Sequence, residues 1–247
     1  MSAAAAFPSW AILEPFVFRR DDDASFPDET KAPVRASGTT SWGAPFRIAF
    51  SFAEPPRVSR LYVQLPGFPG PDKQTPLVIL ATHRHLTLLR VATELPNFVM
   101  VQDFFIYSAY NPSSLQRLPP CTEPSGQRRR GHLLPYPKDH EGVERRILAI
   151  RSMGLLCRGE GEEFAVAELK LFTSRSRNKV HADIFFLKSA VPAGLCGEKW
   201  SSMRVPILHS GNPDEDDIRQ LSLWNTDDVI PIDRWLCWID YSRGVLF

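Results

Sequence analysis

The sequence predicts an all-β protein made of short strands and turns. Its 247 residues include 22 prolines and 14 glycines, which suit many short strands and are too few for a low-complexity polymer. From Phe46 to Phe52 every second residue is apolar, which places those side chains on one buried face of a strand. The runs Phe104–Tyr107 and Trp235–Ile239 are almost continuously apolar, which indicates strands covered on both faces.

Two series of strands follow the same order along the chain, which predicts a repeated sheet. The first series is Leu86–Val91, Phe104–Tyr107 and Leu115–Leu118, and the second is Phe164–Leu169, Ile184–Leu187 and Arg204–Leu208. A repeated four-stranded antiparallel unit is typical of propeller blades. We therefore expect a propeller-like stack of antiparallel four-stranded sheets that is incomplete in this chain. A β-sandwich is the alternative.

The predicted organisation has two parts. Residues 1–70 hold N-terminal strands and a polar loop over Arg19–Gly43. The strands expected there are Trp10–Phe18, Phe46–Phe52 and Val58–Leu65. Residues 71–247 hold the repeated, blade-like sheets. We expect the polar insert at residues 119–146 to be flexible, because it offers little apolar surface to bury.

Four further local features are predicted. Thr75–Val91 is interpreted as two strands hinged at Thr82–Arg84, Asn111-Pro112 as a turn, and Ile147–Met153 as a strand. In Asn212-Pro213-Asp214-Glu215 a capping residue precedes a proline at the first helical position and an acid at the third. This pattern predicts a helix that ends near Leu221.

Composition and charge exclude several classes of protein. The 29 basic and 28 acidic residues leave no excess charge to hold a nucleic-acid backbone, so nucleic-acid binding is not expected. The longest apolar runs are too short for a membrane-spanning helix, and Met1–Asp23 has no signal-peptide pattern. The four cysteines have no C-x-x-C spacing and are expected to be free thiols: Cys121, Cys157, Cys196 and Cys237. These features predict an intracellular protein, in the cytoplasm or the nucleus.

No residue pattern specifies a cofactor, a metal or a catalytic group. His83 and His85 would share one side of a strand and could ligate zinc, but no third ligand lies nearby in the sequence. Cys121, His132 and His140 are irregularly spaced in the insert. We therefore expect no metal site, no cofactor and no catalytic residue.

Glycine-rich and charged clusters are interpreted as turns and solvated loops. Gly159-Glu160-Gly161 is too short for a phosphate-binding loop, and the adjacent Glu162 and Glu163 are expected to be solvated. The basic clusters Arg128–Arg130 and Arg175–Lys179 lack the interleaved aromatic residues that stack on bases.

The order of short motifs in the last hundred residues is distinctive. These motifs are Phe164–Leu169, His181–Ser189, Trp200 with Arg204–Ile207, Trp224-Asn225-Thr226-Asp227 and Trp238-Ile239-Asp240-Tyr241-Ser242-Arg243-Gly244-Val245-Leu246-Phe247. Together with Pro8–Leu13 and Glu54–Ser59, they resemble the plant family catalogued as domain of unknown function 1618. That family usually has Leu-Trp where Tyr241-Ser242 stand. Its chains continue past this motif, so this chain resembles an N-terminal portion or a truncated product.

The resemblance implies a propeller-like β fold similar to that of F-box-associated and kelch-type repeats. It implies no established activity, cofactor or catalytic residue.

Six residues near the C-terminus are expected to have a structural role: Trp224, Asp227, Trp238, Asp240, Arg243 and Gly244. Trp235–Phe247 is predicted to form a hairpin, in which the Asp240 carboxylate accepts hydrogen bonds from the turn and Gly244 takes a positive φ. The functional alternative is an acid–base pair between Asp240 and Arg243. In a tight turn we expect this pair to be exposed to water and its pKa values to shift little.

The expected function is a non-enzymatic scaffold that binds another protein. The alternatives are a hydrolase-type propeller enzyme and a ubiquitin-ligase substrate adaptor related to F-box-associated repeats, although no F-box-like helical segment precedes Trp10. An enzyme predicts a polar pocket with several close, buried carboxylates. A binding protein predicts an exposed apolar or charged surface instead.

Overall fold

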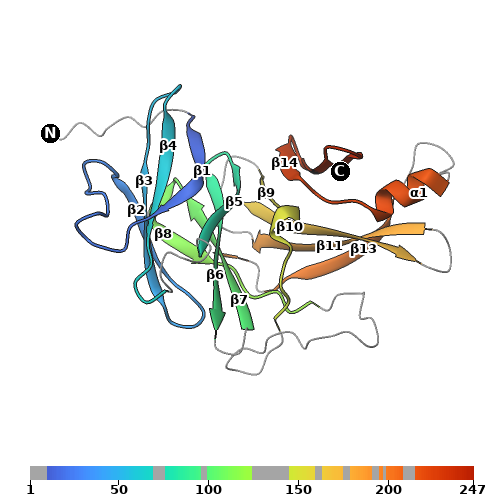
Figure 1. Ribbon diagram of the computed structural model, residues 1–247, viewed down its shortest axis with the longest axis horizontal. Coiled ribbons are helices and arrows are strands. Elements are labelled where there is room, and N and C mark those ends of the chain that lie inside the picture. Colours follow the sequence, from blue (N-terminus) through green and yellow to red (C-terminus); the bar gives the residue numbers. More distant parts are fainter. Residues whose placement is uncertain are drawn as a thin grey trace. The chain divides into compact units, whose positions relative to one another are not determined.

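The computed structural model describes residues 10–68, 76–95, 99–123, 145–158, 163–174, 179–190, 195–196, 199–207 and 215–247. Almost all of their regular structure is β-strand, which confirms the predicted all-β class (Figure 1). The chain forms two compact units. Unit 1 comprises Met1–Ile79, Leu88–Thr93 and Gln102–Arg117, and unit 2 comprises Leu80–Thr87, Glu94–Val101 and Leu118–Phe247.

The N-terminal strands of unit 1 lie side by side in the order β1-β4-β3-β2. Their bounds are β1 (Ile12–Arg19), β2 (Val34–Thr39), β3 (Pro45–Ser51) and β4 (Val58–Gln64). β1 pairs with β4 in parallel, and the other pairs are antiparallel. The alternation predicted for β3 is confirmed, because Phe46, Ile48 and Phe50 are all buried in the core of this unit.

Strand β2 corrects the prediction of a continuous polar loop between Arg19 and Gly43. It pairs with β3 from Val34 opposite Phe50 to Thr39 opposite Pro45. Only the side chains of Val34 and Ala36 are buried in the core, so just two apolar residues in the sequence indicate this strand. At Gly38 an added Cβ would lie 2.7 Å from the ring of Phe46, so the small side chains leave room for that ring.

The same sheet continues from β2 through β8-β7-β6-β5. The bounds of these strands are β5 (Leu77–His83), β6 (Leu86–Leu95), β7 (Val99–Ser108) and β8 (Asn111–Arg117). The prediction of two strands within residues 75–91 is confirmed, with Arg84 in the turn at a φ of 55°.

The predicted turn at Asn111-Pro112 is wrong. The turn lies at Ala109 and Tyr110, and Asn111 begins β8. A proline fits near the start of a strand, where its missing N–H removes no essential ladder hydrogen bond. The pairing with β7 shifts its register just before this point, between Tyr107 and Ser108.

The second series of strands forms an antiparallel sheet in unit 2, in the order β9-β10-β11-β13. Its bounds are β9 (Met153–Cys157), β10 (Phe164–Ser174), β11 (Lys179–Ala190) and β13 (Ser201–Pro206), and the short β12 (Leu195–Cys196) also pairs with β11. The order β10-β11-β13 matches β6-β7-β8, as the two predicted series require.

The strand predicted at Ile147–Met153 is wrong, because residues 145–149 are irregular and a 3₁₀ helix occupies Ile150–Ser152. The cause is a side chain on the neighbouring strand. The N–H of Ala149 donates to the Glu168 carboxylate at 2.6 Å instead of to a strand backbone.

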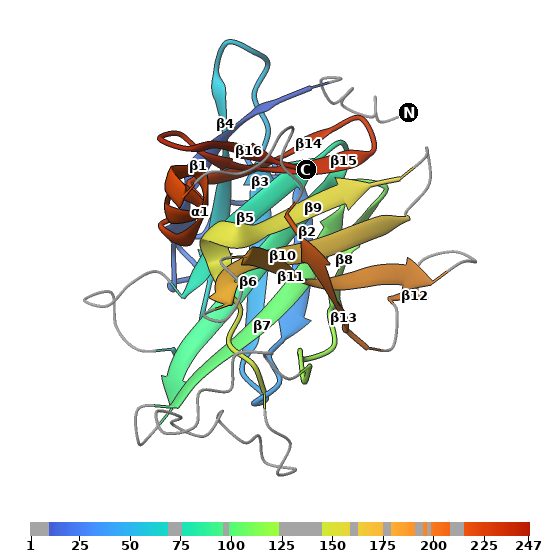
Figure 2. The same cartoon turned by 90° about the vertical axis from the view of Figure 1, so that its right-hand side faces the viewer.

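A C-terminal sheet of three antiparallel strands packs on the β9–β13 sheet within unit 2 (Figure 2). It comprises β14 (Asp228–Ile232), β15 (Trp235–Asp240) and β16 (Gly244–Leu246), and the helix α1 (Glu215–Ser222) precedes it. The predicted C-terminal hairpin is therefore confirmed. The described helix matches the prediction at its C-terminal end, while residues 212–214 lie outside the described residues.

The two sheets of unit 2 share one apolar core. Val229, Leu236 and Trp238 of the C-terminal sheet pack with Leu156, Ala167 and Leu169 of the larger sheet. The indole Nε1 of Trp238 also donates to the carbonyl oxygen of Ser152 at 2.9 Å, so its polar atom is satisfied inside the core.

Other expectations are tested only in part. Most of the 119–146 insert lies outside the described residues, and its flexibility stays a prediction. Cys121, Cys157 and Cys237 are buried free thiols, as expected, whereas the side chain of Cys196 is not described. None of the described helices is long and apolar enough to cross a membrane.

Gly154 provides a test of the contact between the two sheets of unit 2. A Cβ added there would lie 2.5 Å from Val229 Cγ1, so Gly154→Ala should lower the free energy of unfolding by about 1 to 3 kcal/mol. Chemical denaturation measures this change. In a Val229→Ala background the same substitution should cost much less. An equal cost in both backgrounds would contradict the close packing of β9 on β14.

Candidate functional site

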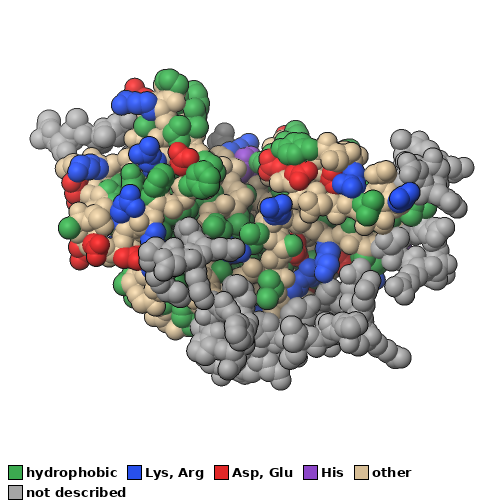
Figure 3. Space-filling view, viewed as in Figure 1, with side chains coloured by type: hydrophobic (Ala, Val, Ile, Leu, Met, Phe, Trp, Pro, Cys, Tyr) green, Lys and Arg blue, Asp and Glu red, His purple; other side chains and the backbone are tan. Residues whose placement is uncertain are grey.

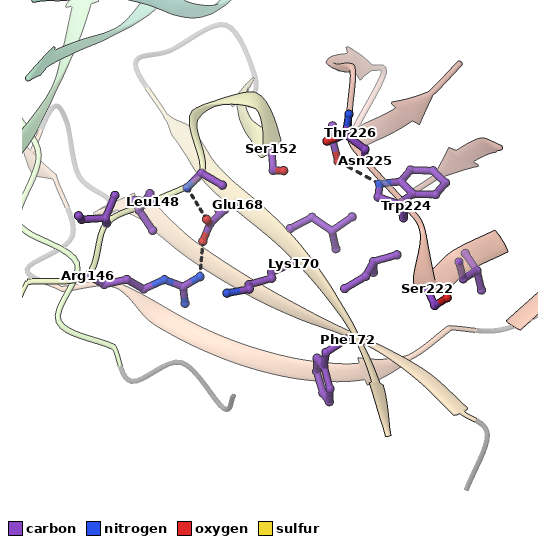
Figure 4. A pocket seen from close by; sticks show the side chains of 15 residues that line it. Arg146, Leu148, Ser152, Glu168, Lys170, Phe172, Ser222, Trp224, Asn225 and Thr226 are labelled. Atoms are coloured by element: carbon purple, nitrogen blue, oxygen red, sulfur yellow. Dashed lines mark hydrogen bonds and ion pairs between the residues drawn. The ribbon is translucent and has the colours of Figure 1, made fainter. Parts of the chain in front are cut away.

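A cavity of about 380 Å³ lies in unit 2 (Figure 4). It is bounded by residues 168–172 of β10, by the irregular segment 146–149, by Leu221 and Ser222 at the end of helix α1 and by residues 224–226 after it. Five consecutive residues of one strand line it, although side chains alternate between the two faces of a strand. The cavity therefore lies beside the edge of β10, so that the backbone of the strand forms part of its wall together with side chains.

The deepest charged groups of the cavity form a buried ion pair. Arg146 Nη2 lies 2.7 Å from Glu168 Oε2, and both side chains are almost fully buried. Burial raises the pKa of Glu168 although Arg146 and the Ala149 N–H oppose that shift. The guanidinium also lies over the Phe185 ring at 3.3 Å from its centroid. Both Glu168 oxygens thus have partners within the protein.

The cavity does not supply a pair of carboxylates. Among the described residues that line it, Glu168 is the only acid. Glycoside-type hydrolysis needs two carboxyl groups at a fixed separation, one of which is free to exchange a proton. The described wall of the cavity therefore offers no such pair, and its remaining polar groups are Lys170, hydroxyls and one amide.

A second ion pair lies on the neighbouring strands of the same sheet. Arg204 of β13 donates to both carboxylate oxygens of Asp183 on β11, at 2.7 and 2.9 Å, and its guanidinium stacks over Phe172 at 4.1 Å. Lys170 of β10 is the exposed neighbour of Asp183 in the register. Arg204 already bonds to both carboxylate oxygens of Asp183. The exposed Lys170, which lines the cavity, therefore adds a positive charge there.

Four of the six predicted C-terminal residues lie together at the hairpin turn: Asp227, Asp240, Arg243 and Gly244. Asp240 accepts hydrogen bonds from the backbone N–H groups of Asn225 and Ser242, both at 2.9 Å, and from Arg243 Nη1 at 2.9 Å. Asp227 accepts from the N–H of Tyr241 at 2.9 Å. Gly244 has a φ of 132°, a value that side chains disfavour, so the glycine serves the turn.

The two tryptophans of this set have structural partners as well. The Trp224 indole N–H donates to Thr226 Oγ1 at 3.0 Å, and the ring lies against the core that contains Trp238. Trp224 also lines the cavity. The motif therefore joins the chain after α1 to the C-terminal hairpin.

The expectation that Asp240 is exposed to water is wrong, since the residue is only 2% exposed. Burial raises its pKa, but the hydrogen bonds from Asn225, Arg243 and Ser242 outweigh that effect, and the net shift is downward. Sequence reasoning missed the contribution of Asn225, which lies fifteen residues away in the chain.

Of the other candidate residues, the structure describes only some. The Nδ1 atom of His83 accepts a hydrogen bond from the Cys157 N–H at 2.8 Å, and burial lowers the pKa of this histidine. No cluster of three metal-ligating side chains occurs among the described residues. His132, His140, Gly159–Gly161 and Arg128–Arg130 lie outside them, as does most of Arg175–Lys179.

Sequence reasoning also missed an exposed apolar surface. The run Trp235–Ile239 was expected to be covered on both faces, but the Trp235 side is covered only in part: Cys237 is buried there, whereas Trp235 is 51% exposed. We call this surface the C-terminal apolar face, and it consists of Ile230, Ile232, Trp235, Val245 and Phe247. Figure 3 shows apolar side chains at the surface over this part of the chain.

Comparisons of the chain with protein-family models, with curated proteins and with solved structures found no match. The resemblance to the plant family of domain of unknown function 1618 therefore stays a prediction.

The buried ion pair predicts a large effect on stability. Arg146→Met leaves the Glu168 carboxylate buried without its counter-ion and should lower the free energy of unfolding by about 3 to 5 kcal/mol at neutral pH. Because burial raises the pKa of Glu168 above its ordinary value of 4.5, the carboxyl is easily neutralised, and the loss should shrink as the pH falls. Denaturation at several pH values measures it. Arg151→Met, at an exposed arginine nearby, is the control, and an equal effect of both variants would contradict this role.

The Asp240 cluster predicts a loss that also shrinks in acid, but at a lower pH, because the pKa of Asp240 is lowered whereas that of Glu168 is raised. Asp240→Asn should cost about 1.5 to 3 kcal/mol at neutral pH, the usual size for hydrogen bonds to a charged group. The lowered pKa means that this contribution is full above 3.8 and is lost as the pH falls further, so the two proteins should converge in acid. Asp228→Asn, at an exposed aspartate, should change little. A gap between wild type and Asp240→Asn that persists in acid would contradict the assignment.

Proposed function

We propose that this protein is a non-enzymatic interaction module that binds another protein through the C-terminal apolar face. The observation that carries the proposal is the orientation of β15. Leu236 and Trp238 point into the core and are at most 7% exposed, whereas Trp235 on the opposite side is 51% exposed. The buried side fixes the sheet, so the apolar outer face cannot turn away from solvent.

The composition of this face matches the centre of a protein interface. Trp235 pairs across the strands with Ile232, and its ring meets the Phe247 ring edge to face at 6.4 Å between centroids. The guanidinium of Arg234 lies 5.5 Å from the centroid of the Trp235 ring. Tryptophan and arginine are enriched among residues that dominate binding energy, and contiguous apolar patches mark binding surfaces.

The shape of the face favours a macromolecular partner. Small-molecule sites are concave and enclose most of the ligand surface. The outer side of a three-stranded sheet offers side chains instead of an enclosure, with exposed Asp228, Asp233, Arg234 and Arg243 of both signs around it. We infer that the partner presents an apolar patch with a polar rim of mixed charge.

The alternative functions have weaker support. A hydrolase-type enzyme would use converging carboxylates, whereas the described wall of the cavity carries the single, paired Glu168. The ubiquitin-ligase adaptor depends on the family resemblance alone.

The test compares two matched pairs of exposed aromatic residues in the full chain. Trp235→Ala with Phe247→Ala removes the aromatic part of the face, and Trp10→Ala with Phe16→Ala removes equally exposed rings elsewhere. Partners captured from extracts of cells that express the protein are identified by mass spectrometry, purified and titrated by calorimetry. The first pair should weaken binding by about thirtyfold or more, as for interface hot spots. The second pair should change it little.

Two results would contradict the proposal. One is a purified partner that binds both double variants equally well. The other is sedimentation showing that the wild-type chain self-associates and that the Trp235 and Phe247 substitutions abolish it, which would make a second copy the occupant of the face.

A further inference from the structure

We propose that the free edge of β10 beside the cavity binds an extended segment of another polypeptide as an added β-strand, and that this segment alternates apolar and acidic side chains. This site is separate from the C-terminal apolar face and goes beyond the proposed function. Strand addition uses main-chain hydrogen bonds for affinity and alternate side-chain pockets for specificity.

Within the described residues the edge has no neighbouring strand beyond Glu168, because β9 ends earlier along β10 than β11 does. β11 pairs with β10 as far as Ser174, whereas β9 pairs with it only as far as Glu168. The residue that would come next on the β9 side is Ser152. Its N–H donates to the carbonyl of Ala149, so the ladder does not continue beyond this residue. Its carbonyl accepts the Trp238 indole N–H and also faces the Leu169 N–H at the end of the ladder.

The hydrogen bonds of Phe164, the first residue of β10, show which backbone N–H and carbonyl groups of the strand point toward β11 and which point toward the cavity. Both the N–H and the carbonyl of Phe164 bond to the hydroxyl of Ser189 on β11, so both point toward that strand. Backbone groups of successive residues point to opposite edges of a strand, and the β10–β11 register runs without a shift. Leu169 and Leu171 therefore turn their N–H and carbonyl groups toward the cavity. The pair Glu168–Met153 places the Leu169 N–H against the Ser152 carbonyl at the end of the β9 ladder, whereas the Leu169 carbonyl and both backbone groups of Leu171 have no hydrogen-bond partner within the described residues.

The two sides of the cavity differ in chemistry. On one side Leu171, Leu221 and Trp224 present apolar surface. On the other side lie Lys170 and Phe172, which leave β10 on the side away from Trp224 (Figure 4). Since an added strand also points alternate side chains to opposite faces, one set of its side chains would meet the leucines and the tryptophan, and the other set would meet Lys170.

The charges on the second side favour acidic partners. Among the described residues here, the two acids Glu168 and Asp183 face three bases, Arg146, Arg204 and the exposed Lys170, so this wall carries a net positive charge. Arg146 Nη1 also has no hydrogen-bond partner in the described structure. A segment with glutamate or aspartate at alternate positions would complement this wall, whereas lysine there would be repelled.

The probe is a seven-residue peptide of alternating valine and glutamate with a fluorescein label, titrated into the full chain by fluorescence anisotropy. Two control peptides differ in one respect each. The first has lysine in place of glutamate. The second carries N-methyl groups on every other amide, and it is made in two versions, one with the odd-numbered amides methylated and one with the even-numbered amides methylated. The acidic peptide should bind saturably, and both controls should bind at least about tenfold more weakly, because they lose charge complementarity or the added ladder.

Variants of the protein locate the site. Lys170→Glu should weaken the acidic peptide by about tenfold, while Lys188→Glu, at another exposed lysine of the same sheet, should change little. Trp235→Ala with Phe247→Ala should leave peptide binding intact, so failure of this site and failure of the proposed function are distinguishable. Amide hydrogen exchange at Leu171 should be fast in the free chain and slow with peptide, whereas Lys170 and Phe172 should be protected in both.

Three results would overturn the proposal: no saturable binding, N-methylated peptides that bind as well as the parent, or a Leu171 amide that is already protected in the free chain. In the first case Lys170 would serve to keep the edge from pairing with other chains, a common use of edge lysines.

Discussion

The packing of the C-terminal sheet on β9 and β10 is the interaction on which the rest of unit 2 depends. Val229, Leu236 and Trp238 meet Leu156, Ala167 and Leu169 in one core, and the absence of a side chain at Gly154 permits the close approach. Because strand side chains alternate, burying Trp238 on one face necessarily turns Trp235 outward on the other. The exposed aromatic surface and the buried core therefore both follow from which face of β15 packs on the larger sheet.

The same contact also limits the length of β9. The Trp238 indole occupies the Ser152 carbonyl, and the Glu168 carboxylate occupies the Ala149 N–H, so the chain before Met153 is held by side chains instead of by a neighbouring strand. The Arg146–Glu168 ion pair then closes the inner end of the space beside β10. Breaking such a buried pair is costly, so this pair acts as a structural element of the cavity.

Much of the fold could be predicted from the sequence, because strong local patterns, such as the alternating apolar residues Phe46, Ile48 and Phe50, indicate which side chains are buried. The matching strand orders of β6-β7-β8 and β10-β11-β13 also follow from the sequence. Weak patterns failed. β2 has only Val34 and Ala36 as its apolar signal, and Pro112 resembles a turn residue although it lies within a strand. The environment of Asp240 depends on Asn225, a contact that spacing alone does not reveal. A continuous apolar run such as Trp235–Ile239 does not say which face is left open.

Hydroxyl-radical footprinting tests the orientation of β15, because it measures the solvent access of each aromatic side chain. In the free chain we expect strong modification of Trp235 and Phe247 and protection of Trp238. With a bound partner, Trp235 and Phe247 should become protected while Trp10 stays accessible. Equal modification of Trp235 and Trp238 in the free chain would contradict the orientation of β15. Protection of Trp10 alone in the complex would contradict the proposed interface.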